Sequence, residues 1–216
     1  MTRPLLLGHR GARASRHIPE NTLASFELCL QQGCDGFEFD VRRSADGVAV
    51  VCHDPVVRGL AIDKTMASDL ELPTLSDVLR GFGARALLDI ELKVAGIEED
   101  AMSLLHKFPP QKGYVISSFL SEVMTRIHEL NPEVPLGFLS EKRSELTRWE
   151  KAPVEWVIPH VSLPDHALIE RVHAAGKNVI VWTVNDADRM RELVQWGVDA
   201  IITDETERGS RVVAGL

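Results

Sequence analysis

Cysteine, positive charge and long apolar runs are all scarce in this chain of 216 residues. Its three cysteines, Cys29, Cys34 and Cys52, are odd in number and lack the Cys-x-x-Cys spacing. We therefore expect buried, reduced thiols in a cytoplasmic protein rather than a disulfide framework. Because 32 acidic residues outnumber 24 Lys and Arg residues, giving a net charge of −8, a nucleic-acid partner is not expected.

No apolar run approaches the roughly 20 residues needed to span a bilayer, so stable membrane insertion is not expected. No Pro/Gly/Ser-rich linker divides the chain, which predicts one domain over residues 1–216. The sequence does not indicate an oligomeric state.

What the chain does have is a regular alternation of strand-like and helix-like segments. The strand-like segments are rich in β-branched and other apolar residues, as strands buried on both faces are. They cover residues 5–9, 34–41, 86–92, 114–119, 134–139, 154–160, 179–185 and 200–204. Residues 48–52, after an Asp-Gly turn, are expected to pair back on the second strand.

Eight strand–helix units predict an α/β protein with a closed TIM-type (β/α)8 barrel of parallel strands, a fold of about 200–250 residues. A doubly wound open sheet is the competing architecture. It needs no eighth unit and usually carries a Gly-rich first loop, which this sequence lacks.

Several of the strand-like segments carry charged residues near their ends. Three of these charged residues are carboxylates. Glu38 and Asp40 are two residues apart, so their side chains point to the same face of their strand. Glu91 ends the third strand, and in a barrel it would share their pocket. Three carboxylates in one small volume cannot all stay ionised without a cation. Oxygen-only ligation favours one hard divalent ion, Mg²⁺ or Ca²⁺, over zinc.

Positive and titratable residues are expected around the same pocket. Arg10 and Lys93, with a divalent cation and the three carboxylates, leave one net positive charge, which matches the single negative charge of a phosphodiester. His9 and His53 are able to exchange protons near neutral pH, one as a base and one as an acid. The pattern predicts a site that cleaves phosphodiesters.

The ordered motifs resemble those of the glycerophosphodiester phosphodiesterase family over essentially the whole chain. The motifs are His9-Arg10-Gly11, Pro19-Glu20-Asn21-Thr22, Glu38-x-Asp40, His53-Asp54, Glu91-x-Lys93, Val181-Trp182-Thr183-Val184-Asn185 and the run from Gly197 to Asp204. The resemblance implies a TIM-type barrel that uses a divalent cation to hydrolyse glycerophosphodiesters to glycerol 3-phosphate and an alcohol.

The resemblance also implies roles for individual residues. It assigns the metal to Glu38, Asp40 and Glu91, catalysis to His9 and His53, phosphate contacts to Arg10 and Lys93, and a place near the substrate to Trp182. The chain departs from the family between Pro55 and Leu72, where a short loop is expected in place of the usual inserted cap. The alcohol side of the pocket is then expected to have a low wall and to tolerate many alcohols.

Two other functions stay open at this point. One is a related barrel that acts on lysophospholipids, some relatives of which form a cyclic phosphate. The other is a barrel that binds phosphate esters without turning them over.

Several further residues have both a structural and a functional interpretation. Trp182 either fills the core or forms a wall of the substrate site. His160 either contacts substrate or is structural. Asn21 is expected to cap the helix that follows it, and Glu20 to cap it or approach the cation. The remaining expectations are that Asp54 orients His53, that Ser117 and Phe119 line the pocket, and that residues 141–145 form a solvated helix face.

Overall fold

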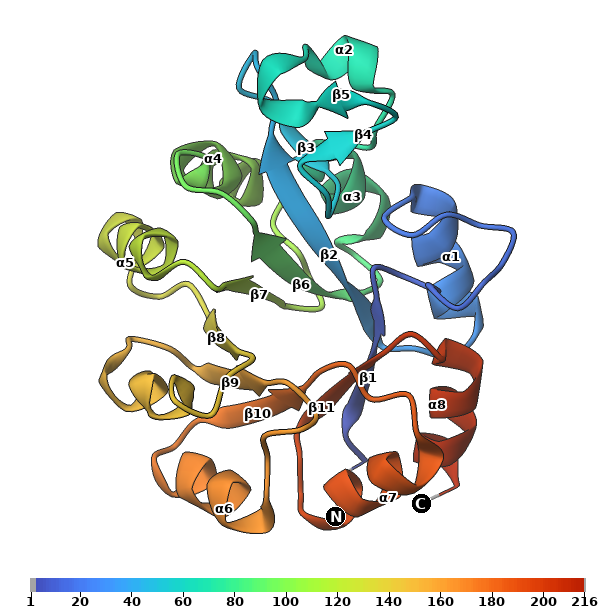
Figure 1. The fold of residues 1–216 in the computed structure, drawn as a ribbon, viewed down its shortest axis with the longest axis vertical. Coiled ribbons are helices and arrows are strands. Elements are labelled where there is room, and N and C mark those ends of the chain that lie inside the picture. The colour runs from blue at the N-terminus through green and yellow to red at the C-terminus, as the bar shows by residue number, and fades with distance from the viewer. Residues whose placement is uncertain (1–2, 216) are drawn as a thin grey trace.

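The structure, a computed structural model, describes residues 3–215. Eight parallel strands form a barrel with helices around its outside (Figure 1). The first strand pairs with both the last and the second, which closes the barrel. The barrel strands are β1 (Leu5–His9), β2 (Gly36–Arg43), β6 (Leu87–Leu92), β7 (Tyr114–Ser118), β8 (Leu136–Ser140), β9 (Trp156–Pro159), β10 (Asn178–Val181) and β11 (Ala200–Thr203). The predicted TIM-type barrel is confirmed.

Seven of the connections between barrel strands, or after the last one, contain an α-helix. These helices are α1 (Leu23–Gln31), α3 (Leu75–Phe82), α4 (Glu98–Lys107), α5 (Ser121–Leu130), α6 (His166–Ala174), α7 (Ala187–Gln195) and α8 (Thr206–Ala214). Between β8 and β9 the chain forms only a 3₁₀ helix, η2 (Leu146–Lys151). The expected helix face at residues 141–145 is therefore wrong, because these residues form the turns that lead into η2.

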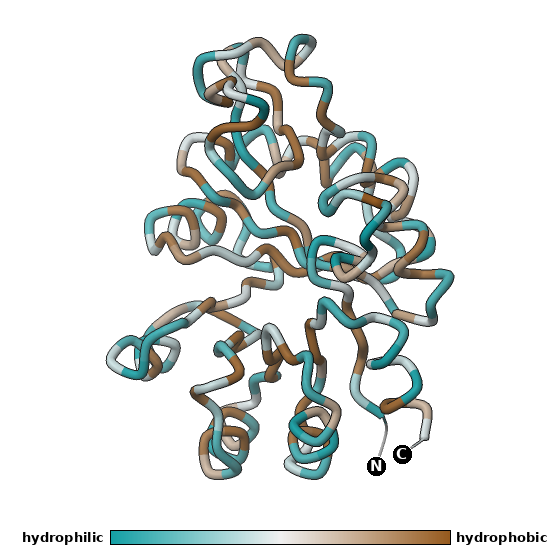
Figure 2. The backbone as a smooth tube through the Cα atoms, turned by 45° about the vertical axis from the view of Figure 1, so that its right-hand side comes forward, coloured by the Kyte–Doolittle hydropathy of each residue, from teal (hydrophilic) through white to brown (hydrophobic). Residues whose placement is uncertain are grey.

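Side chains alternate between the two faces of the barrel strands, as the period of two requires. Inward-facing Leu7, Ile180 and Ile202 belong to one buried cluster that fills the barrel. The neighbouring Leu6 and Ile201 belong to a separate, larger cluster that includes the inner faces of the helices. Figure 2 shows apolar residues along the strands and hydrophilic residues over much of the outer helical surface.

Helix α1 begins one residue later than an Asn21 cap would place it. Thr22 is the N-cap, and its side chain accepts a hydrogen bond from the backbone N–H of Ser25 at 3.1 Å. The expectation that Asn21 caps this helix is wrong. Asn21 is buried with a left-handed backbone (φ 56°), and its side chain reaches β2 instead.

The second strand continues beyond the barrel, as the Asp-Gly turn predicts. β3 (Ala49–Val51) pairs antiparallel with the end of β2. The segment from Pro55 to Leu72, expected to be a short loop, is instead folded. It forms a two-stranded ribbon of β4 (Val56–Val57) and β5 (Leu60–Ala61), a 3₁₀ helix η1 (Ile62–Lys64) and a short helix α2 (Ala67–Leu70).

This folded segment sits beside β3 at the top of Figure 1. It has a small apolar core of its own, in which Ile62 and Leu70 pack with Val50 and Cys52. The packing ties the segment to the strand that precedes His53.

The three cysteines are free and buried, as expected. Among the helices of residues 3–215, none has the length and apolar character required to cross a membrane.

Candidate active site

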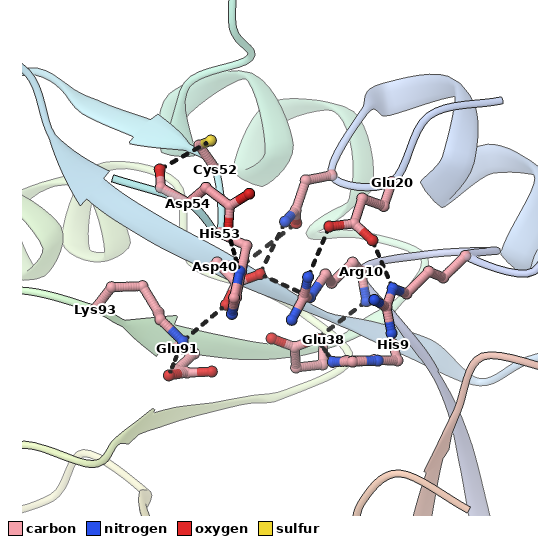
Figure 3. A network of polar contacts seen from close by, with 12 residues as sticks. His9, Arg10, Glu20, Glu38, Asp40, Cys52, His53, Asp54, Glu91 and Lys93 are labelled. Atoms are coloured by element: carbon pink, nitrogen blue, oxygen red, sulfur yellow. Dashed lines mark hydrogen bonds and ion pairs between the residues drawn. The ribbon is translucent and has the colours of Figure 1, made fainter. Parts of the chain in front are cut away.

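A pocket of about 270 Å³ lies at the C-terminal ends of the barrel strands, the face where TIM barrels place their active sites. It contains most of the side chains that the sequence singles out (Figure 3). Its lining residues are His9, Arg10, Glu38, His53, Asp89, Glu91, Lys93, Ser117, Phe119, Leu139, Glu141, Trp182 and Ile202.

The three expected carboxylates meet at one side of this pocket, where Glu38 and Glu91 line it and the buried Asp40 lies next to them. Glu38 and Asp40 come from β2, and Glu91 lies beside Asp40 in the parallel pairing of β2 with β6. One oxygen from each carboxylate lies within 4.8 Å of the others. Asp40 is fully buried, and Glu38 and Glu91 are 5% and 8% exposed.

Burial and mutual repulsion affect the three carboxyl groups differently. Burial, reinforced by the neighbouring charges of Asp40 and Glu91, raises the pKa of Glu38 well above its usual value. Burial also raises the pKa of Glu91 to about 7, although Lys93 opposes this shift. For Asp40, burial is outweighed by Lys93, Arg10 and a hydrogen bond from Asn21, so its pKa is lowered.

This arrangement fits one hard divalent cation. All the clustered donors are carboxylate oxygens, the ligands that Mg²⁺ and Ca²⁺ prefer. In addition, the buried Glu38 Oε1 has no hydrogen-bond partner among residues 3–215. A buried polar oxygen without a partner is costly, and a bound cation would satisfy it.

Arg10 and Lys93 flank the carboxylates, as expected. Lys93 Nζ lies 2.6 Å from Glu91 Oε1 and 3.3 Å from Asp40 Oδ1. Arg10 Nε lies 3.3 Å from Asp40 Oδ2, and its Nη1 donates to Glu20 at 2.7 Å. Glu20 therefore positions Arg10 rather than joining the carboxylate cluster. The Arg10 backbone is left-handed (φ 54°), and its N–H donates to Glu38 at 3.0 Å.

His9 lies at the end of β1 between two carboxylates. Its Nδ1 is 2.7 Å from Asp204 Oδ1, and its Nε2 is 3.9 Å from Glu38 Oε2. Burial opposes the charge of Asp204, but hydrogen bonds from His9 and Asn185 lower its pKa to about 2. An ionised Asp204 favours the tautomer of His9 with the proton on Nδ1, which leaves Nε2 free to accept a proton.

His53 follows β3 and lines the same pocket as His9. Its Nδ1 is 2.8 Å from Asp54 Oδ1, as expected for a residue that orients the ring. Its backbone carbonyl accepts a hydrogen bond from Arg42 Nε at 2.7 Å. The side chain is 35% exposed, so it remains open to exchange protons with solvent.

Trp182 forms part of the apolar side of the pocket. Its Nε1 donates to the Ile158 carbonyl at 3.0 Å, and its ring meets Phe119 edge-on at 5.7 Å. Phe119 and Ser117 line the pocket, as expected. His160 packs edge-on against Trp182 at 5.4 Å and is absent from the residues that line this pocket.

Five polar residues of the site were not assigned to it from the sequence: Asn21, Asp89, Glu141, Asn185 and Asp204. Asn21 donates to Asp40 Oδ2 at 2.8 Å, and Asn185 donates to Asp204 Oδ2 at 2.7 Å. Asp89 lies two residues before Glu91 on the same face of β6 and receives a hydrogen bond from Ser117 at 2.6 Å. Asn21, Asn185 and Asp204 lie within the motifs that resemble the family, and Asp89 has the same spacing from Glu91 as Glu38 has from Asp40.

The fold and the site together define a TIM-barrel phosphodiesterase, with acidic, basic and imidazole groups gathered at the C-terminal face. Comparison with known proteins makes the assignment specific. A model of the Glycerophosphoryl diester phosphodiesterase family matches residues 9–86 and 68–208. The chain therefore belongs to this family of enzymes.

Relatives and solved structures agree with this assignment. A glycerophosphodiester phosphodiesterase of Caldanaerobacter subterraneus is 28% identical, and the match covers 94% of this chain and 95% of the relative. One from Bacillus subtilis is 27% identical, with 99% and 87% covered. A phosphodiesterase of Oleispira antarctica, solved with its product sn-glycerol-3-phosphate, superposes with a TM-score of 0.86 at 28% identity, covering 98% of this chain and 97% of that one.

Proposed function

We propose that this enzyme hydrolyses glycerophosphodiesters to glycerol 3-phosphate and an alcohol, with one divalent cation, Mg²⁺ or Ca²⁺, held by Glu38, Asp40 and Glu91. The observation that carries the proposal is the joint lining of one pocket by carboxylate, basic and imidazole side chains. The product bound in the Oleispira antarctica structure supports the same reaction. The three free, buried thiols support a cytoplasmic location.

Each side chain has a defined part in this proposal. Arg10 and Lys93 bind the phosphate oxygens and stabilise the negative charge that grows on them in the transition state. When bound, the cation would supply further positive charge beside the phosphate. His9, with Nε2 free, accepts the proton of the attacking nucleophile, and His53 protonates the departing alkoxide. Trp182 forms a wall against the substrate.

Product analysis with glycerophosphocholine tests the reaction. The enzyme is assayed in H₂¹⁸O with Mg²⁺ or Ca²⁺ and with EDTA, and the products are followed by ³¹P NMR and mass spectrometry. We expect ¹⁸O in glycerol 3-phosphate, unlabelled choline, and loss of turnover in EDTA that added cation restores. Full turnover in EDTA would overturn the cation requirement. A cyclic phosphate as the final product, or binding without turnover, would favour one of the other two functions.

A further inference from the structure

The apolar side of the pocket carries a negative charge that the proposed reaction does not use. Glu141 follows β8 directly and lines the pocket together with Leu139, Phe119 and Trp182. Phe119 is 42% exposed, which is unusual for a large apolar side chain in this protein. An exposed ring, a second ring edge-on to it and a carboxylate thus share one side of the pocket.

Glu141 is the exposed carboxylate of this pocket, and among residues 3–215 it shares its lack of a positive partner only with the buried Asp89, which accepts a hydrogen bond from Ser117. Glu91 pairs with Lys93, and Glu38 accepts a hydrogen bond from the backbone N–H of Arg10. Among residues 3–215, no Lys, Arg or His side chain lies within ion-pair distance of the Glu141 carboxylate, which belongs to an exposed residue. Its charge is therefore available to a ligand.

The barrel topology places Glu141 opposite the phosphate-binding residues. β8 is four strands away from β1 in both directions around the eight-stranded barrel. His9 and Arg10 stand at the end of β1, so Glu141 faces them across the mouth of the pocket. A phosphodiester held beside Arg10 and Lys93 would direct one of its two arms toward Glu141 and the aromatic rings.

We propose that this side of the pocket binds the alcohol and favours alcohols that carry an ammonium group, such as choline and ethanolamine. Aromatic faces attract ammonium groups, and a nearby carboxylate adds a charge of the correct sign. The apolar walls also suit the methyl groups of choline better than they suit hydroxyl groups. The inference rests on the proposed function, and it differs from the broad tolerance of alcohols expected from the sequence, so the same experiment decides between the two.

The test compares an ammonium-bearing substrate with a neutral one in matched variants. We would measure kcat/KM for glycerophosphocholine and glycerophosphoglycerol with the wild-type enzyme, E141Q and E133Q. Glu133 is an exposed residue before β8, at the opposite end of the strand from Glu141, so E133Q removes the same charge far from the pocket. The assays are run at low and at high salt.

We expect the ratio of the two kcat/KM values to favour glycerophosphocholine in the wild-type enzyme. In E141Q this ratio should fall by about 2- to 5-fold, the size expected for an exposed charge pair, and the difference should shrink at high salt. E133Q should keep the wild-type ratio. Turnover of both substrates with the same ratio in the wild-type enzyme and E141Q would overturn the ammonium site alone. Absence of turnover of either substrate by the wild-type enzyme would overturn the proposed function itself.

Discussion

Glu38 and Asp40 are two residues apart on one strand, yet their pKa values move in opposite directions. Asp40 keeps its charge because Lys93, Arg10 and Asn21 all surround it. Glu38 has mainly burial and like charges around it, so its ionised form is disfavoured. At the scale of the residue, the site thus combines one ionised carboxylate, Asp40, whose charge is balanced by neighbouring cations, with two carboxylates that have too little positive charge nearby to stabilise their ionised forms.

Glu91→Gln tests whether the cluster holds a cation. The variant should bind Mg²⁺ or Ca²⁺ more weakly and turn over more slowly, because one ligand loses its charge. Without metal it should be more stable near pH 8 by about 1–3 kcal/mol, because burial raises the pKa of Glu91 to about 7 and its ionised form destabilises the fold. Calorimetric titration and thermal unfolding measure the two effects, with E133Q as the control. Cation binding at wild-type strength would show that Glu91 is not a ligand.

The two histidines are distinguished by the leaving group. Either His9→Ala or His53→Ala should lower the rate by about 10²–10⁴-fold when an acid–base role is lost. A p-nitrophenyl ester needs no protonation of its leaving group, so it should largely restore the rate of the His53→Ala variant but not that of His9→Ala. Steady-state kinetics with activated and natural substrates decide between the roles. Restoration of His9→Ala instead would reverse the assignment.

Asp204→Asn should affect both stability and catalysis. The lowered pKa of Asp204, about 2 in the fold against an ordinary value of 3.8, means that its charge stabilises the protein above about pH 4. This contribution is lost as the pH falls from about 4 to 2, so the stability difference of about 1–2 kcal/mol between wild type and variant should shrink over that range. Urea unfolding at several pH values measures it.

The same variant should lower kcat by at least about 10-fold, because Asp204 sets the tautomer and orientation of His9. A purely structural role for Asp204 would change stability but leave the pH profile of kcat as in the wild type.

At the scale of the elements, the packing of α1 on β2 supports the strand that carries Glu38 and Asp40. Phe26 of α1 stacks on Phe37 of β2 with ring centroids 4.2 Å apart and nearly parallel planes, and Phe82 of α3 meets both rings edge-on. All three rings are buried. Because Phe37 precedes Glu38, this packing fixes the outer face of the strand whose inner face carries the carboxylates.

Phe26→Ala should therefore destabilise the protein by about 3–5 kcal/mol, the usual effect of removing a buried aromatic ring. Leu23→Ala, on the same helix but 40% exposed, should change stability by less than about 0.5 kcal/mol. Denaturant unfolding of the two variants provides the measurement. Equal losses would mean that α1 contributes little through its buried face.

At the scale of the whole molecule, barrel closure joins parts of the chain that are far apart in sequence. His9 and Asp204, separated by 195 positions, are hydrogen-bonded because β1 pairs with β11. The folded segment from Pro55 to Leu72 packs against β3 and so supports His53 from outside the barrel. The protein is acidic overall, yet Arg10 and Lys93 concentrate positive charge at the pocket.

The sequence by itself determined the barrel and the carboxylate wall, because both depend on local periodicity. Eight apolar strand-like segments that alternate with helix-like segments predict parallel strands. The spacing of Glu38 and Asp40 puts both on the same face of one strand. The two histidines and the two basic residues end or directly follow strand-like segments, so the sequence also predicts that they surround the same pocket. The prediction that residues 141–145 form a helix face was wrong because a mixed-charge run is equally compatible with turns.

Only the tertiary structure decided which side chains complete the site. Asn is a favoured N-cap residue, and Asn21 lies just before a helix. However, its loop approaches β2, and the Asn21 side chain donates a hydrogen bond to Asp40 instead. Closure of the barrel places Asp204 beside His9 and Glu141 across the mouth of the pocket from it. Such pairings join residues distant along the chain, and no periodicity of the sequence encodes them.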